Sequence, residues 1–131
     1  MSSNVFTVKF HGVRGSIPSP LASEEVEGKL VQALQKAKPE DLADEGSIES
    51  FVQGLPHEVR GTFGGNSSCV TVQVGDELLI FDAGSGIRML GQDLMATGFG
   101  RGQGKAHMFF SHTHWDHILG IPFFVPFYIK G

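Results

Sequence analysis

The chain of 131 residues lacks features that several common protein classes require. Its single cysteine, Cys69, cannot form a disulfide within the chain, which excludes a disulfide-stapled scaffold. There is no run of basic residues, and a formal charge of −4 at pH 7 gives no broad attraction to nucleic acid or anionic lipid. No apolar stretch approaches the roughly 20 residues that span a bilayer, and the N-terminus lacks the pattern of a cleaved leader. We therefore expect a soluble, cytoplasmic protein that does not enter a membrane.

The composition favours a folded domain whose functional groups lie on loops. A hydrophobic fraction of 40% with 18% charged residues is enough to form a core and argues against disorder. The 18 glycines are about twice the usual share, which indicates tight turns and close approaches of the backbone. Cys69 lies in an alternating apolar run, so we expect a buried thiol rather than a reactive one.

Apolar and polar residues alternate, or short apolar runs occur, in four segments that we predict to be strands. These segments are residues 6–11, 69–74, 77–82 and 106–111. Gly75 and Asp76 separate the middle two, and this pair is typical of a tight hairpin turn. We predict a helix after the third strand, from Ile87 to near Gly98.

A helical insertion is predicted at about residues 21–60, between the first two strands. Apolar residues recur at helical spacing over residues 21–38, with Ser23 as the expected N-cap and Pro39 as the stop. A second, shorter helix is predicted within residues 47–55. The charged residues of this segment are most simply explained as a solvated helix face, so we assign the segment no chemistry. We expect residues 1–131 to form part of one domain that carries this insertion.

The chemistry of the chain is concentrated in the six residues 112–117, which read HTHWDH. The pattern HxHxDH should arise by chance in roughly one chain in two thousand of this composition, which is a low risk of a false positive. On extended backbone the side chains of His112 and His114 point the same way and can hold one ion together. Asp116 and His117 follow and can bind a second ion. Imidazole with carboxylate suits Zn²⁺, while Mn and Fe are also compatible.

The three other histidines, His11, His57 and His107, are isolated in the sequence. A lone histidine is more often a satisfied core or surface residue than a metal ligand. We therefore assign metal binding only to His112, His114, Asp116 and His117.

At these residues the chain resembles the metallo-β-lactamase-fold superfamily, in which HxHxDH follows a strand and precedes a helix. The resemblance implies an α/β (α+β) protein with a four-layer αββα sandwich of two similar halves. Residues 79–86 resemble the superfamily's earlier motif, in which an aspartate at a strand end supports the metal-binding loop without being a ligand. Asp82 takes that position and could fix the tautomer of a ligand histidine. The alternative is an ordinary helix N-cap.

Residues 10–18, 64–69 and 121–124 are similar to a narrower branch, which includes ribonuclease Z-like and PhnP-like cyclic phosphodiesterases. This resemblance implies a small-molecule or nucleotide phosphodiester, cyclic nucleotide-like or RNA-like, as the substrate. The side chain of Arg14 and the amides around Gly64, Gly65 and Asn66 could then bind phosphate oxygens. Arg14 could equally make only a structural hydrogen bond.

The resemblance covers only the N-terminal half of the superfamily domain, whose further histidine and aspartate ligands come from downstream segments. Two ions need about six ligands, and the HxHxDH residues offer two to each. We therefore expect the remaining ligands to come from a missing C-terminal half or a partner chain, and a homo-oligomer is one assembly that could provide them. The apolar residues 118–128 are expected to serve in packing and to be exposed without that partner.

The expected activity is that of a binuclear metallohydrolase in which a metal-bound hydroxide attacks a phosphodiester. Asp116 is expected to be a catalytic residue as well as a ligand. One alternative is a metallohydrolase of thioester, lactone or lactam substrates, in which the same hydroxide attacks a carbonyl. A redox di-iron protein usually has a glutamate in place of the second histidine, so His114 argues against it. The remaining alternative is an inactive truncated chain with an incomplete metal site.

Overall fold

The computed structural model describes residues 6–131 and divides into two compact units. The first, the sheet unit, comprises the chain up to Ser19 together with Gly65–Gly131, and the second, the helical unit, comprises Pro20–Gly64. The prediction of an insertion at about residues 21–60 corresponds closely to the helical unit. Among the described residues, no helix is long and apolar enough to cross a membrane.

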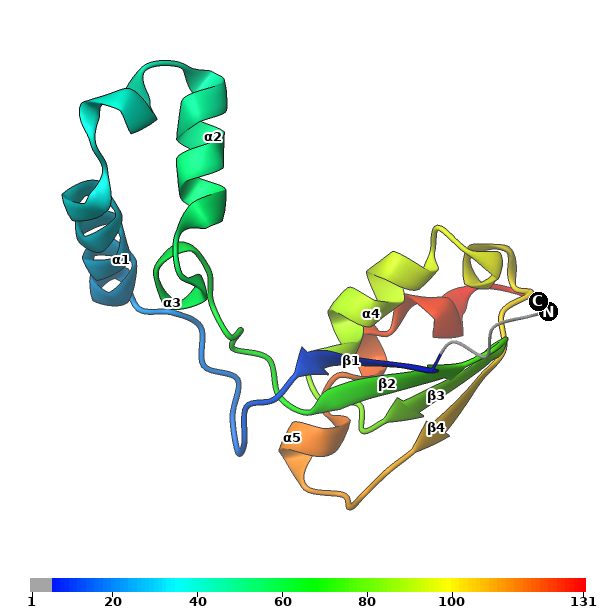
Figure 1. The fold of residues 1–131 in the computed structure, drawn as a ribbon. Helices are drawn as coiled ribbons and strands as arrows, with labels where there is room; N and C mark the ends of the chain where they lie inside the picture. Colours follow the sequence, from blue (N-terminus) through cyan, green and yellow to red (C-terminus); the bar gives the residue numbers. More distant parts are fainter. Residues whose placement is uncertain (1–5) are drawn as a thin grey trace. The chain divides into compact units, whose positions relative to one another are not determined.

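The sheet unit contains four strands, and the predicted strands are confirmed (Figure 1). They are β1 (Phe6–Gly12), β2 (Cys69–Val74), β3 (Glu77–Phe81) and β4 (Ala106–Phe109). The spatial order is β1-β2-β3-β4, with antiparallel pairing of β1 to β2 and of β2 to β3 and parallel pairing of β3 to β4. The turn at residues 75–76 joins β2 to β3 as predicted, with Gly75 at φ 56°.

One face of the sheet forms the core. Leu78 and Ile80 of β3 and Cys69 of β2 pack against Ile87 and Leu90 of α4 (Ile87–Leu94). Phe124, which is 3% exposed, completes this cluster from the closing segment. Figure 1 shows α4 and that closing segment on the same side of the strands. The structure therefore confirms the buried position predicted for Cys69 and the packing role predicted for part of residues 118–128.

The opposite face of the sheet carries apolar side chains that are exposed in this chain. Phe10, Val70, Phe81 and Phe109 form one row across all four strands by register. Phe10 is 67% exposed and Phe109 48%, and the rings of Phe81 and Phe109 stack with centroids 5.4 Å apart. A sheet with one face packed and one apolar face exposed is what half of a two-sheet arrangement presents.

After β4 the chain forms α5 (Trp115–Ile118), and the closing segment then forms two short 3-10 helices, η3 (Ile121–Phe123) and η4 (Val125–Tyr128). Its residues divide between the core and the surface, because Phe124 is buried while Phe127 and Tyr128 are 58% and 69% exposed. The expected exposure of this segment therefore applies to some of its aromatic residues only. Another 3-10 helix, η2 (Gly98–Arg101), follows α4.

The helical unit consists of α1 (Ser23–Lys36), the 3-10 helix η1 (Pro39–Leu42), α2 (Glu45–Gly54) and α3 (His57–Arg60). The prediction of Ser23 as the N-cap of α1 is wrong, because Ser23 is already helical and Ala22 holds the cap position. The Glu25 carboxylate accepts a hydrogen bond of 2.8 Å from the Ala22 amide instead. Helix α2 begins two residues before the predicted segment, since the Asp44 side chain caps it through the Ser47 amide.

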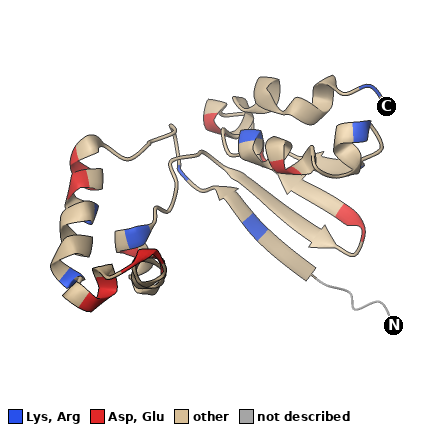
Figure 2. Ribbon diagram, turned by 90° about the horizontal axis from the view of Figure 1, so that it is seen from above, with Lys and Arg blue, Asp and Glu red and all other residues tan. Residues whose placement is uncertain are grey.

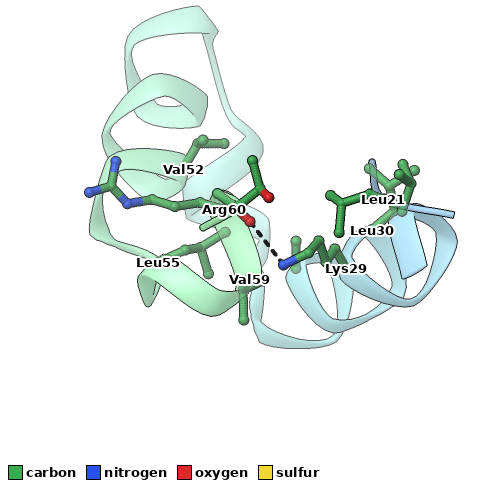
Figure 3. Close-up of a pocket in the computed structure, with 11 residues that line it drawn as sticks. Leu21, Lys29, Leu30, Val52, Leu55, Val59 and Arg60 are labelled. Atoms are coloured by element: carbon green, nitrogen blue, oxygen red, sulfur yellow. Dashed lines mark hydrogen bonds between the residues drawn. The ribbon is translucent and has the colours of Figure 1, made fainter. Parts of the chain in front are cut away.

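An apolar cavity of about 380 Å³ lies within the helical unit, between α1 and the segment that carries α3 (Figure 3). Leu30 contributes to its lining from α1, and Leu55 and Val59 line the other side. Lys29 joins the two sides, because its ammonium donates hydrogen bonds to the carbonyl oxygens of Glu58 and Gly61. The charged residues of this unit lie along its helices (Figure 2), which agrees with the prediction of a solvated face.

Candidate metal centre

The HxHxDH residues follow β4 and lead into α5, so the predicted strand–loop–helix context is present. His114 has extended backbone (φ −63°, ψ 151°) and occupies the N-cap position of α5, which begins at Trp115. The imidazole of His112 lies beside two other rings, with its centroid 4.5 Å from that of His114 and 4.0 Å from that of His117. The fold thus gathers the three histidines at the C-terminal end of β4.

His117 lies between two carboxylates. Its Nδ1 is 2.8 Å from Oδ2 of Asp82, and its Nε2 is 3.3 Å from Oδ2 of Asp116. All three side chains are largely removed from solvent, at 17% exposure for His117, 9% for Asp82 and 11% for Asp116. Both carboxylates are acceptors, and the shorter contact favours a neutral His117 that donates its Nδ1–H to Asp82 and leaves Nε2 directed at Asp116.

Asp82 occupies a special backbone position at the end of β3. Its φ is 61°, a left-handed conformation that costs most residues free energy and that Asp tolerates better than most. Its amide donates to the Phe109 carbonyl of β4 (2.8 Å), while its Oδ1 accepts from the Ser111 amide (2.8 Å). Asp82 therefore joins the end of β3 to the start of the histidine loop through both backbone and side chain.

The pKa of Asp82 reflects two opposing influences. Burial raises it, but hydrogen bonds from the Ser111 amide, His117 and the Ser111 hydroxyl, together with the charge of His117, outweigh burial. The net result is a pKa below the ordinary value of the carboxyl group. Asp82 is consequently an ionised acceptor at neutral pH.

Close backbone contacts fix the loop after Asp82 against α5. The Ala83 amide donates to the His117 carbonyl (2.7 Å), and the Gly120 amide donates to the Ala83 carbonyl (2.8 Å). A Cβ on Gly84 would lie 2.3 Å from the Asp116 carbonyl oxygen, and one on Gly120 would lie 2.1 Å from the Gly84 carbonyl oxygen. Only glycine fits at these two positions without a backbone shift.

Sequence reasoning missed two serines that contact these side chains. Ser16 has φ 64° and donates its amide to Oδ2 of Asp116 (2.9 Å), although the two are 100 positions apart. Ser111 contacts both Asp82 oxygens and the Nδ1 atoms of His112 and His117. Ser16 lies within residues 10–18, whose resemblance to a known branch assigned it no contact, whereas Ser111 directly precedes the first histidine and could have been proposed from that position.

The donor atoms at His117 and Asp116 fit one metal ion. Two ligand atoms about 2.1 Å from a tetrahedral Zn²⁺ lie about 3.4 Å apart, and Nε2 of His117 and Oδ2 of Asp116 are 3.3 Å apart. Their chemistry, imidazole nitrogen and carboxylate oxygen, also suits the ion. Within residues 6–131, however, no three or more His, Cys, Asp or Glu side chains converge on a common ion position. Metal binding by His112, His114, Asp116 and His117 therefore stays a prediction.

The residues predicted to bind phosphate hold loops of the backbone together. In the sheet unit, the Asn66 carbonyl accepts from the Val13 and Arg14 amides, and its side-chain oxygen accepts from the Ser85 hydroxyl (3.0 Å). The Gly65 carbonyl accepts from the Ser19 amide (2.8 Å).

In the helical unit, the Gly64 amide donates to the Thr62 hydroxyl (2.9 Å), so that amide already has an acceptor. Arg14 pairs with Ser67 through its backbone, and the residue is exposed. Phosphate binding by Arg14, Gly64, Gly65 and Asn66 stays a prediction.

The three isolated histidines each have a partner outside the cluster. Nε2 of His11 is 3.0 Å from the Thr71 hydroxyl, and burial followed by the charge of Lys9 lowers the pKa of His11, against a smaller opposing effect of Asp93. His57 contacts the Thr62 carbonyl (3.2 Å), and His107 contacts Glu77 (3.3 Å).

Comparison with known proteins shows a similarity to a ribonuclease over part of the chain. The chain is 42% identical over 55 residues to ribonuclease Z of Haloferax volcanii. The aligned part is 42% of this chain and 16% of that enzyme, so the chain spans about one sixth of the relative's length. No family model and no solved structure matches the chain. The similarity to a ribonuclease agrees with the prediction of a hydrolase at that coarse level.

Proposed function

We propose that this chain supplies half of a binuclear metal centre in a hydrolase that cleaves phosphodiesters of the RNA or cyclic nucleotide type. The observation that carries the proposal is His117, held by Asp82 at Nδ1 and directed at Asp116 through Nε2. The ring of His112 lies beside that of His117, and the ring of His114 lies beside that of His112. The partial similarity to ribonuclease Z supports a phosphodiester rather than a carbonyl substrate.

His112 with His114 would hold one divalent ion, most simply Zn²⁺, and Asp116 with His117 a second. When bound, two such ions supply Lewis-acid activation of a water and charge stabilisation of the reacting phosphate. The residues of the chain provide the positioning. The Ser16 amide holds Oδ2 of Asp116, and Asp82 holds the ring of His117 in a fixed orientation.

The ligands still needed would come from a further segment or chain. That same partner would cover the exposed apolar face of the sheet, where Phe10 and Phe109 lie. Covering it with a second sheet would complete the four-layer αββα sandwich of the metallo-β-lactamase fold. A single partner would therefore both complete the ligand set and bury this face.

A substrate comparison tests the proposed activity. The chain, together with the segment or partner chain that completes the ligands and with added Zn²⁺ or Mn²⁺, is assayed on bis(p-nitrophenyl) phosphate, a thioester and a lactone. We expect cleavage of the phosphodiester that is lost in Asp116→Asn and retained in His107→Asn, because His107 lies outside the cluster. Equal rates in Asp116→Asn and the unaltered chain, or cleavage of the thioester or lactone alone, would reject the proposed activity.

A further inference from the structure

We propose that Ser111 is a positioning residue that carries the influence of Asp82 to a second histidine. Asp82 contacts His117 directly, whereas it reaches His112 through the Ser111 hydroxyl. One buried carboxylate then sets the tautomers of two proposed ligands. The inference rests on the proposed function for its purpose, but its geometry stands without a metal.

The direction of each hydrogen bond follows from counting protons. A serine hydroxyl has one hydrogen to donate and two lone pairs to accept with. Ser111 Oγ is 2.9 Å from both oxygens of Asp82, and the same carboxyl group accepts hydrogen bonds from the Ser111 amide and the Ser68 hydroxyl. The Ser111 proton therefore goes to Asp82.

His112 must then be the donor toward Ser111. Its Nδ1 lies 3.1 Å from Ser111 Oγ, whose only proton is already committed to Asp82, so the contact is a hydrogen bond only if Nδ1 carries a proton. In the neutral ring this leaves the lone pair on Nε2. His112 thus presents Nε2 as its free ligand atom, as His117 does through its direct bond to Asp82.

Ser111 is itself held at its backbone, so its hydroxyl can be removed without releasing the loop. Its amide donates to Oδ1 of Asp82 at 2.8 Å, a bond that alanine keeps. The contact of Ser111 Oγ with Nδ1 of His117 is longer, at 3.4 Å, and that ring already has Asp82 at 2.8 Å. Loss of the hydroxyl should therefore affect His112 more than His117.

Histidine tautomers of the metal-free full chain, read from two-bond ¹H–¹⁵N correlation spectra at a pH where the rings are neutral, test the inference. We expect His112 and His117 both to be protonated at Nδ1 in the unaltered chain. In Ser111→Ala, His112 should lose its preference while His117 keeps it, and Ser111→Thr should retain both. His11, whose Nε2 bonds to Thr71, serves as an unchanged reference for folding in every spectrum.

Two results overturn the inference: His112 protonated at Nε2 in the unaltered chain, or an unchanged His112 tautomer in Ser111→Ala. Zinc affinity measured on the same samples separates this from the proposed function. If the tautomers behave as expected but zinc does not bind, Ser111 positions His112 and the metal proposal fails. If zinc binds but the His112 tautomer does not depend on Ser111, the inference about Ser111 fails and the metal proposal stands.

Discussion

Nδ1 of His117 lies 2.8 Å from Oδ2 of Asp82, 35 positions earlier in the chain. This contact joins the end of β3 to α5 and fixes which nitrogen of His117 faces Asp116. The geometry depends on the left-handed backbone of Asp82, which turns its carboxylate toward the histidine loop while its amide still pairs with β4. The orientation of His117 therefore depends on a residue at the end of β3, which lies outside the HxHxDH motif.

Replacing Asp82 should weaken metal retention. Asp82→Asn keeps the size of the side chain and tolerates the positive φ. It removes the negative charge from the group that accepts hydrogen bonds from His117 and Ser111. We expect a loss of zinc affinity on the order of 10- to 100-fold, as is usual when a residue that orients a ligand is removed. Asp82→Ala should lose at least as much. Unchanged metal content in both variants, measured after dialysis against a chelator, would refute the role of Asp82.

Substituting Gly120 should destabilise the sheet unit, because the added Cβ would lie 2.1 Å from the Gly84 carbonyl oxygen. We expect Gly120→Ala to lower the free energy of unfolding by at least about 1–3 kcal/mol, the usual cost of overpacking. Gly15→Ala is the matched control, since a Cβ at Gly15 meets no atom within 4 Å. Urea unfolding followed by tryptophan fluorescence measures both variants, and equal midpoints would show that the contact is not tight.

Cys69 should be unreactive in the folded chain. Burial, with a smaller contribution from the charge of Asp82, raises the pKa of its thiol to about 12, so the thiol stays protonated at pH 8. We expect labelling by Ellman's reagent to be slow in buffer and fast in urea. A Ser50→Cys variant supplies an exposed thiol in the same chain for comparison. Labelling of Cys69 in buffer as fast as that of the introduced thiol would contradict its burial in the core.

Asp44 should titrate below its ordinary pKa of 3.8, because the Ser47 amide and hydroxyl donate to its carboxylate at the start of α2. A lowered pKa means that the cap stabilises α2 above pH 3.8 and that this stabilisation is lost as the pH falls through the lower value. The Ser47 amide resonance should follow that titration. It should not do so in Asp44→Asn, which keeps an oxygen acceptor without a titrating proton. A midpoint at or above 3.8 would show that the cap is not formed.

The elements with strong periodicity were predictable from sequence, and their ends were less so. The alternation around Val70 and the Gly75 turn located β2 and β3, because side-chain period and turn chemistry are local properties. Ser23 was mistaken for the cap of α1 because the Glu25 carboxylate, rather than a residue at the cap, satisfies the first amide. Helix α3 was not predicted, since its four residues are too few to show a period.

The residues of the candidate site were likewise predictable from the sequence only in part. His112, His114, Asp116 and His117 were selected from sequence because ligand types at fixed spacing carry chemical information, and Asp82 was selected because residues 79–86 resemble a known motif. Ser16 was not, because its contact with Asp116 spans 100 positions and depends on the fold alone. The hydrogen bonds made by Asn66 were also unpredictable, since they form only when its loop meets residues 13–14 and Ser85.

The central claim is that this chain supplies half of a binuclear centre, and zinc stoichiometry tests it most directly. The purified chain is dialysed to equilibrium at fixed free zinc, its metal content is measured, and light scattering establishes its oligomeric state. We predict at most one equivalent of zinc on the monomer, with occupancy lost in His117→Ala and retained in His107→Ala. Two equivalents of tightly bound zinc on a monodisperse monomer, or binding unaffected by His117→Ala, would contradict the account.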